Sequence, residues 1–221
     1  PGKVLKEANG KSLIEILLHR LSSSKKIDKI LLATGENREN DILARVVEIL
    51  GYEVFRGNEE DVLDRYYQAA SVHHPETVVR ITGDCPLIDS TIVDKAVSKF
   101  VDKRVQYLNN FTPPTYPDGM DVEVFSYQTL ERAWKDVITP EEKEHVTLSM
   151  RKRDDIKKEF LVNEDDWGNV RLTVDELADF QVISGVIGYF WPNLDFSLQD
   201  IMILKKQNPE LFLPNRTIAR N

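Results

Sequence analysis

The sequence predicts an α/β fold in which a mostly parallel sheet is covered by helices on both faces. Short apolar runs alternate with amphipathic helical segments through the first half, and this rhythm is typical of parallel α/β architecture. The second half is less regular, and no repeat or low-complexity linker interrupts the chain. The 221 residues, 41% of them hydrophobic and 30% charged, suit an ordinary globular protein. We therefore expect one domain over residues 1–221.

The elements of the first half follow from apolar periodicity and from capping signals. Ser12 and Glu15 form a capping box, and four residues after Ser12 make one apolar stripe on the helix that follows, namely Ile14, Leu17, Leu18 and Leu21. Further helices are predicted at residues 41–50, 60–72 and 90–100. Strands are predicted at residues 29–34, 52–55 and 77–82, where apolar runs of strand length lie between helices.

The second half contains stronger loop signals. Three prolines predict a rigid loop over residues 111–118. A second capping box at Thr139 and Glu142, with Pro140 in the first helical position, predicts another helix start. Strands are predicted at residues 105–110, 121–125, 158–162 and 170–174, and helices at residues 127–135, 176–188 and 197–206.

Charge and cysteine content exclude several classes of function. The formal net charge is −8, and an acidic chain repels nucleic acid, so we expect no nucleic-acid partner. The single cysteine, Cys85, rules out a disulfide framework within the chain and favours a cytoplasmic setting. No apolar run is long enough to span a bilayer, so we expect no membrane association.

Two acidic residues each follow a predicted strand and precede a predicted helix. Asp84 follows residues 77–82 and Gly83, and Asp175 follows residues 170–174. Ligands of open α/β sheets bind at the carboxyl ends of strands, so a carboxylate pair there suits Mg²⁺. Two simpler explanations remain open: Asp84 can belong to an ordinary turn, and Asp175 can cap the next helix.

Six segments in order carry a resemblance that covers nearly the whole chain. They are PGK at residues 1–3, RGNEEDVLDRY at 56–66, ITGDCPLI at 81–88, YPDGMDVEVF at 116–125, EHVT at 144–147 and RLTVD at 171–175. Together they resemble the spore-coat polysaccharide cytidylyltransferase family, which is related to the CMP-sialic acid and CMP-ketodeoxyoctulosonate synthetases.

The resemblance implies a three-layer α/β/α nucleotide-diphospho-sugar transferase fold of the GT-A-like type, with Mg²⁺ as cofactor and with CTP and a sugar as substrates. It implies catalytic roles for Lys3, Asp84 and Asp175, of which the two acids bind the metal. The implied nucleotide-binding residues are Lys3, Arg65, Arg80, Thr82 and Gly83. The implied sugar-binding residues are Tyr116, Asp121, Glu123, Glu144 and His145. If residues 121–125 form a strand, Asp121 and Glu123 share one face and Val122 and Val124 the other.

The expected reaction is transfer of CMP from CTP to an acidic or polysaccharide-precursor sugar, with release of pyrophosphate, for surface polysaccharide or glycoconjugate synthesis. One alternative is a GT-A-type glycosyltransferase with residues 164–166 as its metal motif, and another is a non-catalytic nucleotide-binding domain. The family places a strand and a phosphate-binding loop before PGK and tends to continue past Arg220, so we expect a fragment at both ends. We also expect a homodimer, with the proline-rich loop either near the interface or closing over its own active site.

Overall fold

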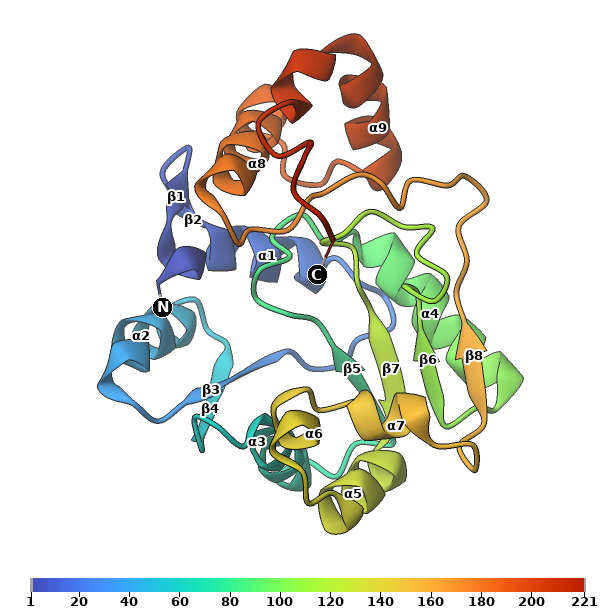
Figure 1. The fold of residues 1–221 in the computed structure, drawn as a ribbon. Coiled ribbons are helices and arrows are strands. Elements are labelled where there is room, and N and C mark those ends of the chain that lie inside the picture. The colour runs from blue at the N-terminus through green and yellow to red at the C-terminus, as the bar shows by residue number, and fades with distance from the viewer. Residues whose placement is uncertain (1, 221) are drawn as a thin grey trace.

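The computed structural model describes residues 2–220, so Pro1 and Asn221, which belong to the two terminal segments noted above, lie outside the described residues. Strand β3 (Leu31–Gly35) pairs in parallel with β4 (Glu53–Gly57). A four-stranded sheet has the order β5 (Thr77–Arg80), β7 (Glu123–Ser126), β6 (Tyr107–Asn109) and β8 (Lys158–Phe160) (Figure 1). The pairings make β5, β6 and β8 run in one direction and β7 against them. Three of the four strands thus share a direction, as expected, but the two pairings of β7 are antiparallel, so the sheet is mixed.

Helices follow the strands much as the sequence predicts. They are α1 (Leu13–Ser22), α2 (Asp41–Ile49), α3 (Val62–Ser71), α4 (Ser90–Lys103), α5 (Tyr127–Asp136), α6 (Pro140–Glu144), α7 (Leu148–Lys152), α8 (Leu177–Phe190) and α9 (Leu198–Gln207). The Ser12 hydroxyl accepts from the Glu15 amide at 3.3 Å and begins α1, whereas the Glu15 carboxylate pairs with Lys11. The Thr139 hydroxyl accepts from the Glu142 amide at 3.4 Å, and Pro140 begins α6 as predicted.

Alternate side chains of β6 and β7 point into two different cores, as the period of two in a strand requires. Leu108 and Val124 pack in a core with buried side chains of α1, α2, α4, α8 and α9. Tyr107 and Phe125 pack on the opposite face with buried side chains of α3, α5 and α7. The sheet thus lies between two helical layers, and the predicted three-layer α/β/α fold is confirmed (Figure 1).

The predicted strand at residues 170–174 is wrong. The segment forms only an isolated bridge between Arg171 and Asp118 among the described residues, and its backbone bonds go to loops: the Asp118 amide donates to the Val170 carbonyl at 2.9 Å, and the Val174 amide to the Asp84 carbonyl at 2.9 Å. The apolar run reflects burial of Leu172 and Val174 rather than membership of a sheet. Gly119 lets the two loops approach, because a Cβ there would lie 2.4 Å from the Leu172 carbonyl carbon.

Some short elements were not predicted from the sequence. A hairpin of β1 (Glu7–Ala8) and β2 (Lys11–Ser12) precedes α1, and three 3-10 turns lie at Lys3–Leu5, Arg38–Asn40 and Pro209–Phe212. Strand β7 begins at Glu123, two residues later than predicted. Among residues 2–220, no helix combines the length and the apolar character that crossing a membrane requires.

Candidate active site

Asp84 and Asp175 lie close together, because both contact the same lysine. The Lys3 Nζ donates to Asp84 Oδ2 at 3.0 Å and to Asp175 Oδ1 at 2.7 Å. The backbone brings the two acids together, since the Val174 amide and the Thr173 hydroxyl both donate to the Asp84 carbonyl, at 2.9 and 3.1 Å. Lys3 lies 81 positions before Asp84 and 172 positions before Asp175, yet these three residues, all predicted from the sequence, form one cluster.

The electrostatics of this cluster favour its charged form. Burial alone would raise the pKa of Asp84, but hydrogen bonds from Thr82 and Lys3 and the charge of the ammonium hold that pKa below its ordinary value. Burial also opposes the charge on Lys3, yet the two carboxylates outweigh it and raise the lysine pKa. The cluster is thus an ammonium held between carboxylates.

Arg171 fixes Asp175 from the side of the protein interior. Its side chain is 6% exposed, and its guanidinium donates to Asp175 Oδ2 at 2.7 Å, to Asp118 Oδ2 at 2.7 Å and to both oxygens of Asp179 at 2.9 and 3.0 Å. A planar guanidinium is suited to bind several carboxylates in fixed directions. Arg171 was not among the residues predicted from the sequence, although its position four residues before Asp175 and eight before Asp179 was a usable signal.

Asp175 does not cap helix α8, so that alternative is wrong. The N-cap is Glu176, which forms a capping box with Asp179. Asp179 Oδ2 accepts from the amides of Asp175 and Glu176 at 3.0 and 2.9 Å. The first turn of α8 therefore holds the backbone of Asp175, and its carboxylate contacts Lys3 and Arg171.

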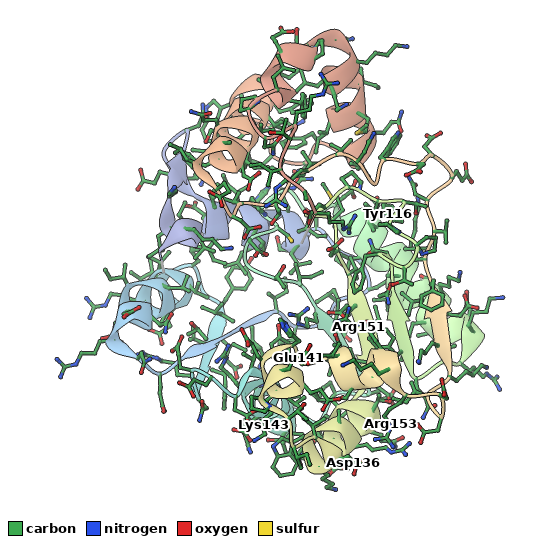
Figure 2. The ribbon with its side chains drawn as sticks, viewed as in Figure 1. Tyr116, Asp136, Glu141, Lys143, Arg151 and Arg153 are labelled. Atoms are coloured by element: carbon green, nitrogen blue, oxygen red, sulfur yellow. The ribbon has the colours of Figure 1, made fainter. Side chains whose placement is uncertain are left out.

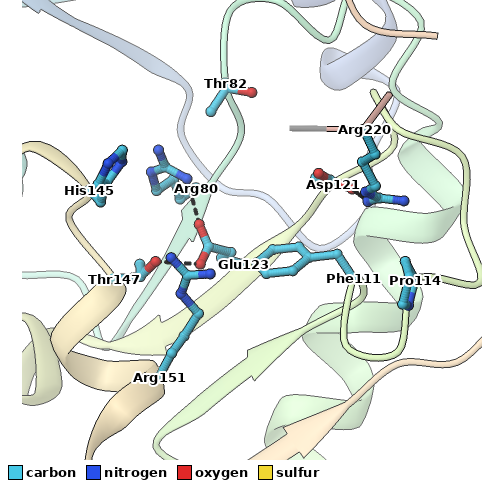
Figure 3. A pocket seen from close by; sticks show the side chains of 10 residues that line it. All are labelled: Arg80, Thr82, Phe111, Pro114, Asp121, Glu123, His145, Thr147, Arg151 and Arg220. Atoms are coloured by element: carbon cyan, nitrogen blue, oxygen red, sulfur yellow. Dashed lines mark hydrogen bonds and ion pairs between the residues drawn. The ribbon is translucent and has the colours of Figure 1, made fainter. Parts of the chain in front are cut away.

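A cavity of about 370 Å³ adjoins this cluster along the chain that continues from β5 (Figure 3). Its lining residues are Arg80, Thr82, Phe111, Pro114, Asp121, Glu123, His145, Thr147, Arg151 and Arg220. Five of them were singled out from the sequence: Arg80, Thr82, Asp121, Glu123 and His145. The other five come from the proline-rich loop, from the turn and helix after His145 and from the C-terminal segment.

Glu123 forms part of the framework of this cavity. Its side chain is 3% exposed, and its oxygens accept from Arg80 Nη1, the Tyr107 hydroxyl and the Thr147 hydroxyl, each at 2.5 Å. These donors come from β5, from β6 and from the turn before α7. Glu123 therefore hydrogen-bonds to both strands and to the turn, and because these bonds fix its position, the wall of the cavity is rigid at this point.

Asp121 lies on the same wall and has an unusual environment. Burial raises its pKa to about 6, with Asp118 and Glu123 adding to the effect and Arg220 partly opposing it. Arg220 Nη2 donates to Asp121 Oδ1 at 2.5 Å, and its Nη1 donates to the Tyr116 carbonyl at 2.9 Å. The C-terminal segment thereby closes one side of the cavity. As the strand period predicts, Val122 and Val124 point instead into the core.

Arg151 differs from the other arginines of the cavity. Arg80 and Arg220 are each paired with a carboxylate, whereas the described part of the chain shows no ion pair for Arg151, whose guanidinium lies 5.7 Å from the centre of the Phe111 ring. Its neighbour Arg153 lies toward α5 and pairs with Asp136 at 2.7 Å (Figure 2). Arg151 is therefore the guanidinium best placed to bind an anionic group of a ligand.

Besides Lys3, Asp84 and Asp175, four predicted site residues do not line the cavity. The Tyr116 side chain is buried in the apolar core and only its carbonyl contacts Arg220, so its expected contact with sugar is not supported by its position. Arg65 donates to the Asn58 and Glu59 carbonyls. Glu144 is an exposed residue at the end of α6, and Gly83 is exposed next to Asp84.

The donor set of Asp84 and Asp175 fits Mg²⁺. The described residues contain no group of three or more acidic, histidine or cysteine side chains that could hold a metal on their own. Mg²⁺ is usually bound by one or two carboxylates together with substrate phosphates and water, so a pair is sufficient. The position of the Lys3 ammonium shows that this pair already stabilises a positive charge.

Comparisons with known proteins show which family the chain resembles. A family model described as Cytidylyltransferase matches residues 1–179. The chain is 29% identical to the spore coat polysaccharide biosynthesis protein SpsF of Bacillus subtilis, over 95% of this chain and 90% of that protein. It is 35% identical to a 3-deoxy-manno-octulosonate cytidylyltransferase of Chlamydia pneumoniae, over 45% of this chain and 39% of that protein. The structure of a cytidylyltransferase from Leptospira borgpetersenii superposes with a TM-score of 0.94 at 32% identity, over 99% and 92% of the two chains.

Proposed function

The chain belongs to the cytidylyltransferase family, and we propose that it transfers CMP from CTP to an acidic sugar and releases pyrophosphate. The observation that supports this most is the cluster of Lys3, Asp84 and Asp175 beside an arginine-lined cavity. The cluster suits a triphosphate with its metal, and the cavity suits a second substrate. The proposed setting is the cytoplasm, and the proposed product serves surface polysaccharide or glycoconjugate synthesis.

In this reaction a sugar hydroxyl attacks the α-phosphorus of CTP. The new bond joins the hydroxyl oxygen to phosphorus, the bond from the α-phosphorus to the bridging oxygen breaks, pyrophosphate leaves, and the hydroxyl proton passes to water. Such a step depends on alignment and on neutralisation of charge. Asp84 and Asp175 would hold Mg²⁺, which would supply Lewis-acid stabilisation of the negative charge on the phosphates. Lys3 would neutralise the phosphates.

The acceptor is proposed to be an acidic sugar because of Arg151. The cavity is lined by three arginines and two carboxylates, and two of the arginines are already paired. A sugar carboxylate would complete the pairing, and a bidentate bond to Arg151 would orient the sugar. The octulosonate cytidylyltransferases that resemble this chain are named for an acidic sugar, which supports the same choice.

The test is pyrophosphate release by the full-length protein incubated with CTP, Mg²⁺ and a panel of acidic and neutral sugars. We expect release with CTP and an acidic sugar, little release with UTP, and none after chelation of the metal. Release from neutral sugars alone would contradict the acceptor class, and no release with any sugar would contradict the activity. A glycosyltransferase would instead consume a sugar nucleotide, and the position of residues 164–166, exposed and outside the cavity lining, gives that alternative no support.

We propose a homodimer as well. Exposed apolar side chains of Phe160 and Val162 lie beside the proline-rich loop, because Asn163 N donates to the Thr115 hydroxyl at 2.9 Å. This surface offers a contact for a second copy of the chain.

A further inference from the structure

Lys3 occupies the place of a cation between the two carboxylates that are proposed to bind Mg²⁺. We infer that Lys3 is an exchangeable counter-ion: it keeps Asp84 and Asp175 together while no metal is bound and leaves them when a divalent ion binds. This inference rests on the proposed function, because it needs a metal at these carboxylates. It adds a positioning role for Lys3 in the state before substrates arrive.

Among residues 2–220, Lys3 and Arg171 both contact Asp175, and the structure indicates which of these two leaves. The Arg171 side chain is 6% exposed and is bonded to three carboxylates, so removing it would leave several buried charges without a partner. The Lys3 side chain is 38% exposed, and the carboxylates that it contacts are Asp84 and Asp175, the proposed metal ligands themselves. A divalent ion at those ligands replaces the contacts of Lys3 and leaves those of Arg171 to Asp118 and Asp179 in place.

The backbone near Lys3 is held well enough to keep the released ammonium nearby. Lys3 begins a short 3-10 turn in which the Leu5 amide donates to the Gly2 carbonyl at 3.0 Å, and Val4 and Leu5 pack against the main core. Val4 also lies beside Gly83, where a Cβ would be 3.4 Å from Val4 Cγ1. The flexible lysine stem can therefore turn from the carboxylates toward phosphates bound near Gly83 without movement of the turn.

The exchange has a consequence for metal affinity. Without Lys3, the carboxylates of Asp84 and Asp175 repel each other, and this repulsion raises the free energy of the metal-free protein. A metal that binds the wild-type protein must first displace the ammonium, so its affinity is lower than the carboxylates alone would give. Since partly exposed ion pairs contribute little each, we expect this penalty to be about 3- to 10-fold in the dissociation constant.

The first experiment uses the wild-type protein. Acetylation of lysines by a succinimidyl ester is followed by peptide mass spectrometry with and without Mn²⁺, in the absence of nucleotide. We expect Lys3 to be acetylated severalfold faster with Mn²⁺, because its amine has left the carboxylates. Lys6, which lies 5.1 Å from the Phe180 ring, is the internal control and should not change. An unchanged or slower rate at Lys3 overturns the exchange.

The second experiment measures Mn²⁺ binding by calorimetry for the wild type, Lys3→Met and the control Lys6→Met. We expect Lys3→Met to bind Mn²⁺ about 3- to 10-fold more tightly and Lys6→Met to match the wild type. Equal or weaker binding by Lys3→Met overturns the exchange while leaving the proposed metal site intact. Absence of Mn²⁺ binding in all three proteins overturns both. If Lys3→Met does not fold, the acetylation result on the wild type decides.

Discussion

At the scale of single residues, the site is a set of carboxylates whose charges are balanced by two kinds of cation: buried side chains that stay in place and a partly exposed one that can exchange. Arg171 is buried and holds Asp175 from inside, whereas Lys3 is partly exposed and contacts it from the side of solvent. In the cavity, Arg220 pairs with Asp121 and Arg80 with Glu123. Buried pairs of this kind position their members, and exposed ones leave a group able to exchange.

The first prediction concerns the proposed metal ligands. Asp84→Asn and Asp175→Asn should each lower turnover by about a hundredfold or more, because an amide is a neutral and weaker ligand for Mg²⁺. Pyrophosphate release at saturating CTP measures this, with circular dichroism and thermal unfolding as controls for the fold. A nearly normal rate in either variant would count against metal binding by that residue.

The second prediction concerns Arg171. Arg171→Met leaves the carboxylates of Asp118, Asp175 and Asp179 without their shared cation, so the free energy of unfolding should fall by about 3–5 kcal/mol. Denaturant unfolding measures the loss. The control is Arg216→Met, since Arg216 is exposed and should change stability by less than about 0.5 kcal/mol. A small effect at Arg171 would show that the acids are satisfied without it.

The third prediction concerns pH and Asp121, whose pKa in the folded protein is raised from 3.8 to about 6. Between these values the folded protein binds more protons than the unfolded chain, so this group lowers stability as pH rises from about 4 to about 6. The free energy of unfolding of Asp121→Asn relative to wild type should therefore increase over this window and be flat above it. A difference that is independent of pH from 4 to 7 would show that the Asp121 pKa is not raised.

At the scale of secondary structure, most helices and strands could be predicted from the sequence; the exceptions are the strand expected at residues 170–174, the short hairpin of β1 and β2, and α7. Capping residues such as Ser12 and Thr139 act within their own segments, so the sequence shows where α1 and α6 begin. An apolar run shows burial but not its partners, which is why residues 170–174 were expected to pair in a sheet and instead bond to loops. Helix α7 is only five residues long and has no side-chain cap, so it gave little signal.

The fourth prediction concerns Arg151 on α7. Arg151→Ala should raise the Michaelis constant for an acidic sugar by roughly 10- to 100-fold and leave that for CTP nearly unchanged, because a charge-assisted hydrogen bond to the acceptor is lost. The control is Lys152→Ala, the next residue of α7, which does not line the cavity. An equal loss for both substrates, or unchanged sugar kinetics, would place the acceptor's anionic group elsewhere.

At the scale of the whole molecule, the site joins segments from both ends of the chain. Lys3 lies against Asp84 and Asp175, and Arg220 closes the cavity at Asp121. The motif segments identified Lys3, Asp84, Asp175 and most of one cavity wall, because these residues lie inside recognisable runs of sequence. The contributions of Arg151 and Arg220 depend on tertiary contacts across loops, and a run of residues does not reveal such contacts.

The fifth prediction is the homodimer, and the surface beside the proline-rich loop is where we expect the contact. Phe160 and Val162 are 36% and 49% exposed at the outer strand β8 and just after it, and the exposed Pro113 and Pro114 belong to the neighbouring loop. Apolar side chains gathered on a rigid surface favour association, since burying them removes apolar area from water. Sedimentation velocity of the full-length protein at micromolar concentration should show a dimer.

Val162→Glu should shift that protein toward monomer, because a charge buried in the contact would lack a partner. Ile138→Glu is the matched control: Ile138 is an apolar residue that is 85% exposed in the connection between α5 and α6, and its replacement should leave the dimer intact. A wild-type monomer at micromolar concentration would exclude the dimer altogether. A dimer that resists Val162→Glu but is lost with Ile138→Glu would move the interface from β8 to the α5–α6 side of the molecule.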